Sequence, residues 1–469
     1  MTEHILFLTG KLAEKAVHRV LESIQPTPFS YEVLNIGLNV AGLMTTDLIR
    51  RRVSDTGKAT RIIVPGRCRG ELHALTQHYG IPFERGPEEV KDLPEFFGKK
   101  KKRRDLTKHD VNIFAEIVDA TQLDIPAILK RAKRYQSDGA DVIDLGCLPD
   151  TPFPHLEDAV GALKVAGFKV SVDSVDPQEL LRGGKAGADF LLSLKEDTLW
   201  IADEVQSIPI LIPNQTGDLN SLYRAIDIMS GKNTLFFFAD AILDPIHFGF
   251  TQSIVRYHAL RERYPHVEIM MGVGNLTELT DADTSGINAI LMGIISELSI
   301  RSILTTEVSP HARRAVREAD VARRMMFAAR EDTSLPKDYS NALLTTHDRK
   351  PFPDTEAEIR DIAAAIKDPS FRIQVSETGI HVYNRDGFHT ASDPFELFPE
   401  LKLEQDSSHA FYVGVELARA QIAWQLGKRY SQDQELDWGV ATQRKQEDQS
   451  AYHAMGTTLQ AKKKQENNK

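Results

Sequence analysis

The stretch from Lys169 to Ser174 reads KVSVDS and ends in a side chain that can do chemistry, the carboxylate of Asp173. Its alternating valines and serines predict a β-strand. The Asp176-Pro177 pair that follows is typical of a helix start. Ligands of parallel α/β folds bind at the C-terminal ends of the strands, because loops and helix N-termini converge there. Asp173 is therefore our first candidate for binding or catalysis.

Other apolar runs of the chain also end in a polar side chain. The full set of candidates is Asp119, Asp144, Asp173, Asn214, Asp240 or Asp244, and Asn275. Carboxylate and amide oxygens accept hydrogen bonds, so this set suits a ligand edge rich in N–H donors, such as the 2-amino-4-oxopyrimidine edge of a pterin. The alternative for any single member is a cap of a helix or the end of a strand.

Metal and disulfide chemistry have weaker support in the sequence. Several carboxylates also suit a divalent cation, but no compact spacing of ligands is present. Cys68 and Cys147 lie far apart in the chain and form neither a metal motif nor a disulfide framework. We therefore predict no metal site and no tightly bound cofactor.

The elements that must position these side chains alternate regularly from Asn112 onward. Helical periodicity separates the apolar runs, for example over 125–136, 177–186, 220–229 and 253–263. About eight strand-helix pairs in about 200 residues are typical of a (β/α)8 TIM barrel, with a doubly wound sheet as the alternative. The predicted strands are 112–118, 141–145, 169–172, 190–194, 209–212, 234–239, 268–273 and 289–292.

Residues 1–98 predict a small N-terminal α/β domain. Its loop 66–70 carries Arg67 and Arg69, a pair suited to a phosphate or carboxylate; the alternative is a solvated turn. Residues 99–107 begin with KKKKRR and predict a basic linker before the barrel at 108–330, although such a run can also contact RNA or an anionic surface.

Prolines after the barrel indicate a second linker, and residues 336–442 predict a C-terminal α+β domain. This domain has a hairpin over 372–383 and a long helix over 408–429. The polar tail 443–469 predicts disorder.

Composition excludes some function classes. The 469 residues are 41% hydrophobic and 26% charged, which is ordinary for a globular protein. The formal net charge of -10 argues against general nucleic-acid binding. No apolar run is long enough to span a bilayer and no signal peptide is evident, so we expect a cytoplasmic protein.

Five segments resemble, in order, the strand-end segments of the pterin-binding barrels, which comprise dihydropteroate synthases and corrinoid-linked pterin methyltransferases. They are GADVIDLG, KVSVDS, GADFLLSL, AILDPIHFGF and EIMMGVGN. The whole chain is similar to the long dihydropteroate synthase-like proteins associated with tetrahydromethanopterin-dependent one-carbon metabolism. The resemblance implies that Asp173 and Asp244 hold the pterin ring as catalytic residues, with Asp144 close by at the second strand end. It also implies a homodimer.

The chain departs from the synthase pattern where positive charge is expected. The segment GVGNLTE has Asn275 and no lysine, and SIRSILTTEV leaves Arg301 as the match for an arginine near the last strand. Loop CLPDTPF lacks the Thr-Arg-Pro pattern of a diphosphate site. Asn275 is instead similar to the pterin-binding asparagine of the methyltransferases.

The resemblance implies a transferase of tetrahydromethanopterin biosynthesis. It would join a hydroxymethyl-dihydropterin diphosphate to a phosphorylated ribosyl-aminobenzene, with Mg²⁺ accompanying the diphosphate and with Arg67 and Arg69 as candidates to replace the missing charge. The alternatives are a pterin-dependent methyltransferase and a non-catalytic pterin-binding subunit.

Overall fold

The computed structural model describes residues 3–98, 105–232 and 236–443. The chain divides into two compact units. One contains residues 105–345 and 438–442, and the other combines the N-terminal region with residues 346–437. The basic run 99–104 and the predicted disordered tail, from residue 444 onward, lie outside the described residues.

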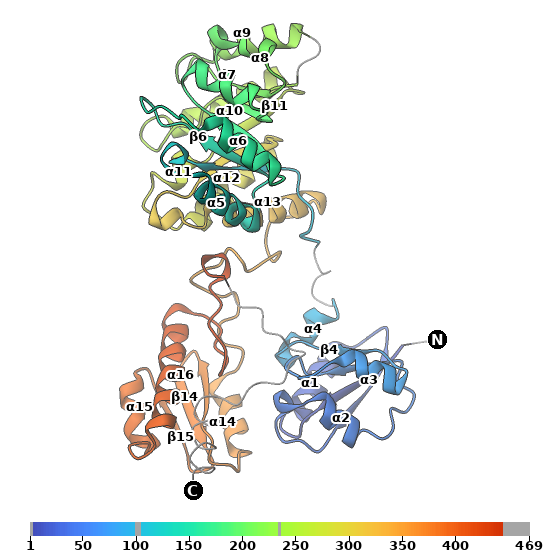
Figure 1. The fold of residues 1–469 in the computed structure, drawn as a ribbon. Helices are drawn as coiled ribbons and strands as arrows, with labels where there is room; N and C mark the ends of the chain where they lie inside the picture. Colours follow the sequence, from blue (N-terminus) through green and yellow to red (C-terminus); the bar gives the residue numbers. More distant parts are fainter. Residues whose placement is uncertain (1–2, 99–104, 233–235, 444–469) are drawn as a thin grey trace. The chain divides into compact units, whose positions relative to one another are not determined.

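The first unit is a closed barrel of eight parallel strands (Figure 1). Around the barrel each strand pairs with its neighbour in the chain, and the last strand pairs with the first through five registered residue pairs. This closure confirms the predicted (β/α)8 barrel. The strands are β5 Asn112–Ile117, β6 Val142–Gly146, β7 Lys169–Asp173, β8 Phe190–Leu194, β9 Ile208–Leu211, β10 Phe238–Ala239, β11 Glu268–Gly272 and β12 Ser302–Thr306.

The eighth strand is not the one predicted. Residues 289–292 lie inside helix α12, Thr284–Glu297, and the strand that closes the barrel is β12. The apolar segment INAILMGII has no alternation that would distinguish a strand from a buried helix. Strand β10 is also shorter than the predicted 234–239, of which residues 234 and 235 are not described.

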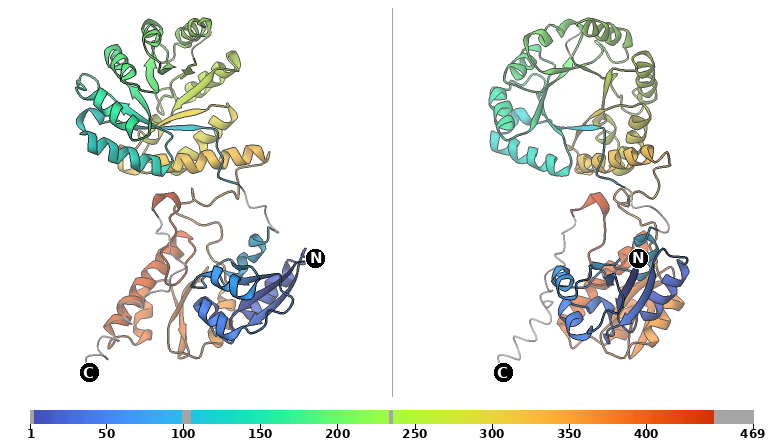
Figure 2. Two further views of the ribbon diagram at one scale, coloured as in Figure 1. Left: turned by 45° about the vertical axis from the view of Figure 1, so that its right-hand side comes forward. Right: turned by 90° about the vertical axis from the view of Figure 1, so that its right-hand side faces the viewer.

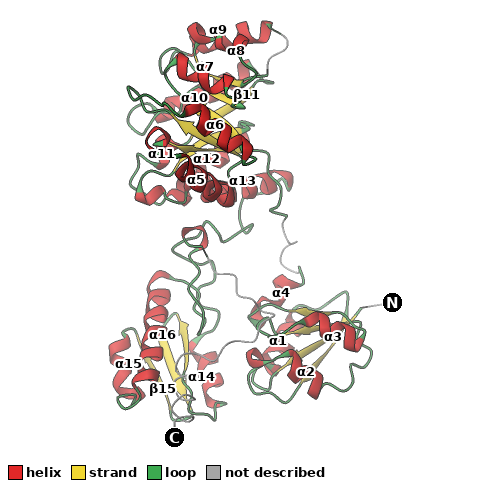
Figure 3. Ribbon diagram, viewed as in Figure 1, coloured by secondary structure: helices red, strands yellow, loops and turns green. Residues whose placement is uncertain are grey.

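Helices surround the barrel strands as an outer ring (Figures 2 and 3). Asp124, Asp176 and Asp218 begin three of these helices by accepting hydrogen bonds from backbone N–H groups in the first turn. The helices are α5 Ile125–Asp138, α6 Leu156–Val165, α7 Pro177–Lys185, α8 Ile201–Glu204, α9 Leu219–Gly231, α10 Phe250–Arg263, α11 Gly274–Thr277, α12 and α13 Ala315–Glu331.

The barrel interior has an apolar layer. Because side chains alternate along a strand, one set faces the helices and the other faces the barrel axis. Phe114, Val142, Leu192, Ile210, Phe238 and Met270 form a cluster separate from the large core beneath the helices. This inner cluster forms the apolar part of the barrel interior.

The N-terminal part of the second unit is a three-layer α/β sandwich with a parallel sheet in the order β2-β1-β3-β4. Alternate residues of β1 pack on opposite faces, Ile5 and Phe7 with α1 and Leu6 and Leu8 with α2 and α3. The elements are β1 His4–Thr9, α1 Glu14–Ser23, β2 Ser30–Asn35, α2 Thr46–Arg52, β3 Arg61–Val64, α3 Leu72–Tyr79, β4 Phe83–Arg85 and α4 Leu93–Phe96.

Residues 346–437 contain a three-stranded antiparallel sheet with helices α15 and α16 packed through one hydrophobic cluster. The predicted hairpin and long helix are both present. Lys91 forms ion pairs with Asp354 and Glu358, which are contacts within this unit. The elements are α14 Glu356–Ala364, β13 Arg372–Ser376, β14 Gly379–Asn384, β15 Gly387–Ala391, α15 Pro394–Leu401 and α16 Ser407–Leu426.

None of the helices in the described part of the chain is both long enough and apolar enough to cross a membrane.

Arg323 links α13, the last helix of the barrel, to the segments that precede β5 and β6. Its guanidinium is buried and pairs with Asp141 and Asp320, while it also donates to the carbonyls of Val111 and Gly139. Removing one partner of a buried ion pair leaves uncompensated charge. We expect Arg323→Ala to destabilise the barrel by about 3 to 5 kcal/mol in chemical denaturation.

The adjacent Arg324 provides the control, because its side chain is 26% exposed although it also pairs with Asp320. Arg324→Ala should cost about 1 kcal/mol. Equal losses for the two variants would contradict the role assigned to Arg323.

Candidate functional site

Strand register places three polar side chains on one level of the barrel interior. Glu116 of β5 pairs with Asp144 of β6, which in turn pairs with Ser171 of β7. Asp173 lies two residues further along β7, opposite Gly146 of β6. Because residues two apart on a strand face the same side, Ser171 and Asp173 both face the barrel axis.

Glu116, Asp144 and Asp173 form a cluster of carboxylates, here called the acidic triad. One oxygen atom from each lies within 4.8 Å of the others. Gly146 makes room for this arrangement, since a Cβ at that position would stand 2.6 Å from Oε1 of Glu116. The carboxylate of Glu116 therefore occupies space that any other residue at 146 would fill.

The acidic triad has few hydrogen-bond donors. Ser171 donates to Oδ1 of the fully buried Asp144, and Oδ2 of Asp144 has no partner. Among the described residues, no group donates a hydrogen bond to the carboxylate of Glu116 or Asp173. Buried carboxylates without donors are costly, so this arrangement indicates a place for a ligand.

The electrostatics of the triad follow from burial and mutual repulsion. Burial, then the charges of Asp144 and Glu278, raise the pKa of Glu116 to about 8. Burial raises the pKa of Asp144 to about 7, against the opposing hydrogen bond from Ser171. The pKa of Asp173 is also raised, by burial and then by Asp144, Glu116 and Asp240. The cluster therefore holds protons at neutral pH.

The other predicted carboxylates have donors from the surrounding helices. Tyr257 of α10 and the backbone N–H of Ile242 donate to Asp240. Arg256, also on α10, pairs with Asp244 at 2.6 Å, and Arg131 of α5 pairs with Asp119. These three carboxylates already accept hydrogen bonds within the protein, which distinguishes them from the acidic triad.

The loop that carries Asp244 is fixed tightly. Arg256 donates to the carbonyls of Ala241 and Ile242 as well as to Asp244. Ile242 has a φ of 63°, which is unfavourable for a β-branched side chain. Such strain persists where surrounding contacts enforce it, and Arg256 is one of those contacts.

The two predicted asparagines are exposed and anchored by neighbouring groups. Asn275 donates through Nδ2 to the carbonyl of Leu243 at 2.7 Å, which links the β11 end to the Asp244 loop. Asn214 exchanges hydrogen bonds with Glu196 at 3.3 Å. In Asn275 this anchor turns the side-chain amide toward the Asp244 loop.

The arginines named in the sequence analysis belong to two different units of the chain. Arg301 precedes β12 and pairs with Asp110, so it lies at the opposite end of the strand from the acidic triad. Arg67 and Arg69 belong to the other unit. There Arg67 donates to Ser431 and lies near Glu88.

Glu116 was missed by the sequence analysis, which selected Asp119 from the same segment. The sequence does contain a signal, because Glu116 follows Phe114 by two residues and must share its face of the strand. An acid on the inward face of a buried strand is a stronger candidate than an acid in the following turn.

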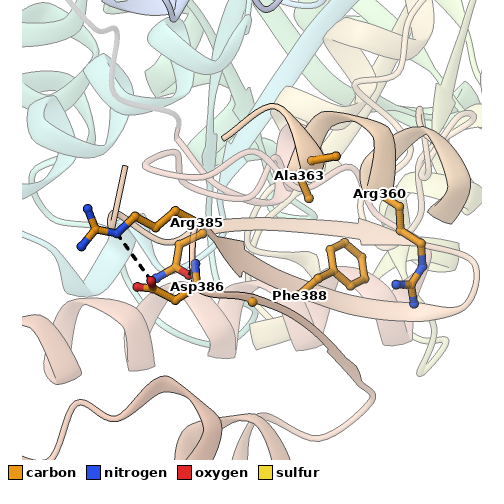
Figure 4. Close-up of a pocket in the computed structure, with 8 residues that line it drawn as sticks. Arg360, Ala363, Arg385, Asp386 and Phe388 are labelled. Atoms are coloured by element: carbon orange, nitrogen blue, oxygen red, sulfur yellow. Dashed lines mark hydrogen bonds and ion pairs between the residues drawn. The ribbon is translucent and has the colours of Figure 1, made fainter. Parts of the chain in front are cut away.

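A hollow of about 330 Å³ lies in residues 346–437 between α14 and the turn that joins β14 to β15 (Figure 4). Arg385 points to Asp386, and Arg360 lies over the ring of Phe388 at 4.2 Å and pairs with Glu356. The charged groups of this hollow are matched by protein partners, in contrast to those of the acidic triad.

Comparison of the sequence with known proteins identifies relatives without an assigned activity. Residues 3–88 match the model of a family of unknown function (DUF6513). An uncharacterized protein of Methanocaldococcus jannaschii is 26% identical over 531 aligned positions, covering 92% of this chain and 98% of that protein. The alignment thus spans nearly the whole length of both proteins.

Solved structures similar to this chain include dihydropteroate synthases. A Yersinia pestis enzyme with a bound pterine-sulfa conjugate is 17% identical, with a TM-score of 0.38, and the match covers 49% of this chain and 95% of that one. A Xanthomonas albilineans enzyme with 7,8-dihydropteroate is 14% identical, with a TM-score of 0.37, covering 50% and 96%. Both matches span about half of this chain.

The raised pKa values of the triad predict a stability that depends on pH. Above about pH 5 the folded barrel keeps protons that the unfolded chain has released, on Asp144 up to a pKa of about 7 and on Glu116 up to a pKa of about 8. Stability therefore falls as pH rises, by about 1.4 kcal/mol per pH unit for each such group. Glu116→Gln should become progressively more stable than the wild type over this range.

The measurement is the difference in Tm between wild type and Glu116→Gln by calorimetry, in buffers containing a chelator. Asp203→Asn provides the control, because it removes an exposed carboxylate paired with Lys232 on α8–α9. A difference that stays constant from pH 5 to pH 8.5 would show that Glu116 titrates normally.

Proposed function

We propose that the barrel binds a reduced pterin at the acidic triad and acts as a transferase of the dihydropteroate synthase type. The observation that carries this proposal is the carboxylate of Asp173, which lies at the end of β7 without a donor. A carboxylate in this position accepts two parallel hydrogen bonds from the ring N–H and the exocyclic amine of a pterin.

A pterin edge also relieves the electrostatic cost of the triad. Hydrogen bonds donated to a carboxylate favour its ionised form, so ring binding would lower the raised pKa of Asp173. Asp144 is fully buried beneath this position and Glu116 lies beside it. The three carboxylates together would select a ligand that presents donors and would disfavour one that presents acceptors.

The proposed reaction is the condensation of a hydroxymethyl-dihydropterin diphosphate with a phosphorylated ribosyl-aminobenzene, in tetrahydromethanopterin biosynthesis. The arylamine nitrogen bonds to the pterin methylene carbon as the carbon–oxygen bond to diphosphate breaks, and the amine then loses a proton. Negative charge at Asp173 stabilises positive charge that develops in the ring as the leaving group departs. Asp244 and Arg256 would hold the neighbouring loop against the ring.

Methyl transfer to or from a reduced pterin is the second candidate, and two observations favour it. Arg131 and Arg256 are already paired with Asp119 and Asp244, and Arg301 lies at the other end of its strand. Diphosphate would therefore need positive charge from elsewhere, with Arg67 and Arg69 as the candidates from the N-terminal region. Methyl transfer has no such requirement, and Asn275 is anchored at the β11 end as that reaction would need.

The test is a calorimetric titration of the full chain with hydroxymethyl-dihydropterin and, separately, with its diphosphate. We expect the wild type to bind the pterin and Asp173→Asn to lose at least about tenfold in affinity, since one charge-assisted hydrogen-bonding pair contributes about 1.5 to 3 kcal/mol. Tighter binding of the diphosphate favours the synthase reaction, and equal binding favours methyl transfer.

Asp203→Asn is the matched control, because it removes one negative charge on α8 from a pair with Lys232. It should bind the pterin as the wild type does. A wild type that binds neither pterin would rule out the proposed function.

A further inference from the structure

We propose that the acidic triad binds a divalent cation of the oxygen-preferring class, such as Mg²⁺, Mn²⁺ or Ca²⁺. The ligands would be Glu116, Asp144 and Asp173, one from each of the consecutive strands β5, β6 and β7. The pterin proposal uses the same three carboxylates, but cation binding goes beyond it, because the cation would also bind to a protein that binds no pterin.

The first step of the argument is the unpartnered oxygen of Asp144. Its side chain is fully buried, and Oδ2 lacks any hydrogen-bond partner while Oδ1 accepts from Ser171. Most buried polar atoms have a partner, so an unpartnered carboxylate oxygen within a cluster of carboxylates indicates that something else meets it. Water, a donor or a cation can do so, and the surroundings decide among them.

The charged groups that act on the triad are all acidic. The triad is repelled by Glu278, which follows α11, and by Asp240, which follows β10. These neighbours are themselves satisfied, Glu278 by the N–H groups of Val308 and Ser309 and Asp240 by Tyr257. The charges that act on Glu116 and Asp173 are thus all negative, and a divalent cation that displaces the protons of the triad is the ligand that would best offset them.

The spacing of the oxygens fits such a cation. Magnesium holds oxygens at about 2.1 Å, which separates adjacent ligands by about 3 Å and opposite ligands by about 4.2 Å. Calcium, at 2.3 to 2.6 Å, allows about 5 Å between opposite ligands. The triad oxygens lie within 4.8 Å of one another, so one ion can contact all three with small movements of the side chains.

Neighbouring residues hold these ligands in place. The hydroxyl of Ser171 fixes Asp144 through one oxygen and leaves the other for the ion, as expected of a group that orients a metal ligand. The absence of a side chain at Gly146 gives Glu116 its place. Neither feature is needed to cap a helix or to end a strand.

The experiment uses the full chain after treatment with a chelator, titrated with Mn²⁺ at pH 8 without pterin. Bound Mn²⁺ is counted by the loss of the free-ion EPR signal, and affinity is measured by calorimetry. We expect one more ion per chain in the wild type than in Asp144→Asn. Ser171→Ala keeps all three carboxylates and should weaken this ion's binding about 10- to 100-fold.

Asp203→Asn removes one carboxylate from α8 and should bind as the wild type does, and circular dichroism establishes that each variant is folded. Equal Mn²⁺ stoichiometry and affinity in wild type and folded Asp144→Asn would overturn the proposal, as would no binding by the wild type at millimolar Mn²⁺. Because no pterin is present, the outcome is independent of the proposed function.

Discussion

The structure depends on a cluster of carboxyl groups held inside a closed barrel. Parallel register forces Glu116, Asp144 and Ser171 to one level, and the next inward residue of β7 is Asp173. These side chains must face the barrel interior, because a one-residue shift in the register of a strand would exchange its inward-facing and outward-facing residues. Phe114, two residues before Glu116 on β5, belongs to the apolar cluster of the barrel interior. Within the barrel the triad therefore receives one donor, the hydroxyl of Ser171, among the described residues.

The surrounding helices determine which acids are available for a ligand. Helix α10 contributes both Arg256 and Tyr257, which meet Asp244 and Asp240, and α5 contributes Arg131 to Asp119. Each of these donors stabilises a loop at the end of a strand by satisfying its carboxylate. No helix contributes a donor to Asp173 in the described part of the chain. The division between structural and ligand-binding acids thus follows from which helix faces which strand.

The sequence predicts the barrel because the alternation of apolar runs and amphipathic helices is periodic, and it places Asp173 because KVSVDS ends a strand so clearly. It does not predict the eighth strand, since the helix α12 is apolar over a longer stretch than β12. It also misses Glu116, which lies inside a strand. The partners of Asp240 and Asp244 lie on α10, beyond the strand-end segments, and only the fold brings each donor to its carboxylate. Spacing alone therefore cannot separate a satisfied acid from an available one.

The charge at the C-terminal ends of the barrel strands affects which of the two proposed reactions the site can support. A diphosphate placed near three carboxylates is repelled, and an internal dielectric strengthens that repulsion relative to water. A divalent cation in the acidic triad would reverse this effect, because it neutralises the carboxylates and offers an attraction to phosphate oxygens. Methyl transfer involves no diphosphate, so it does not need a cation to offset the repulsion between a polyanion and the carboxylates. Occupancy of the triad by a cation would therefore make the synthase reaction compatible with a barrel in which Arg131 and Arg256 are already paired, whereas an ion-free triad is compatible with a neutral pterin.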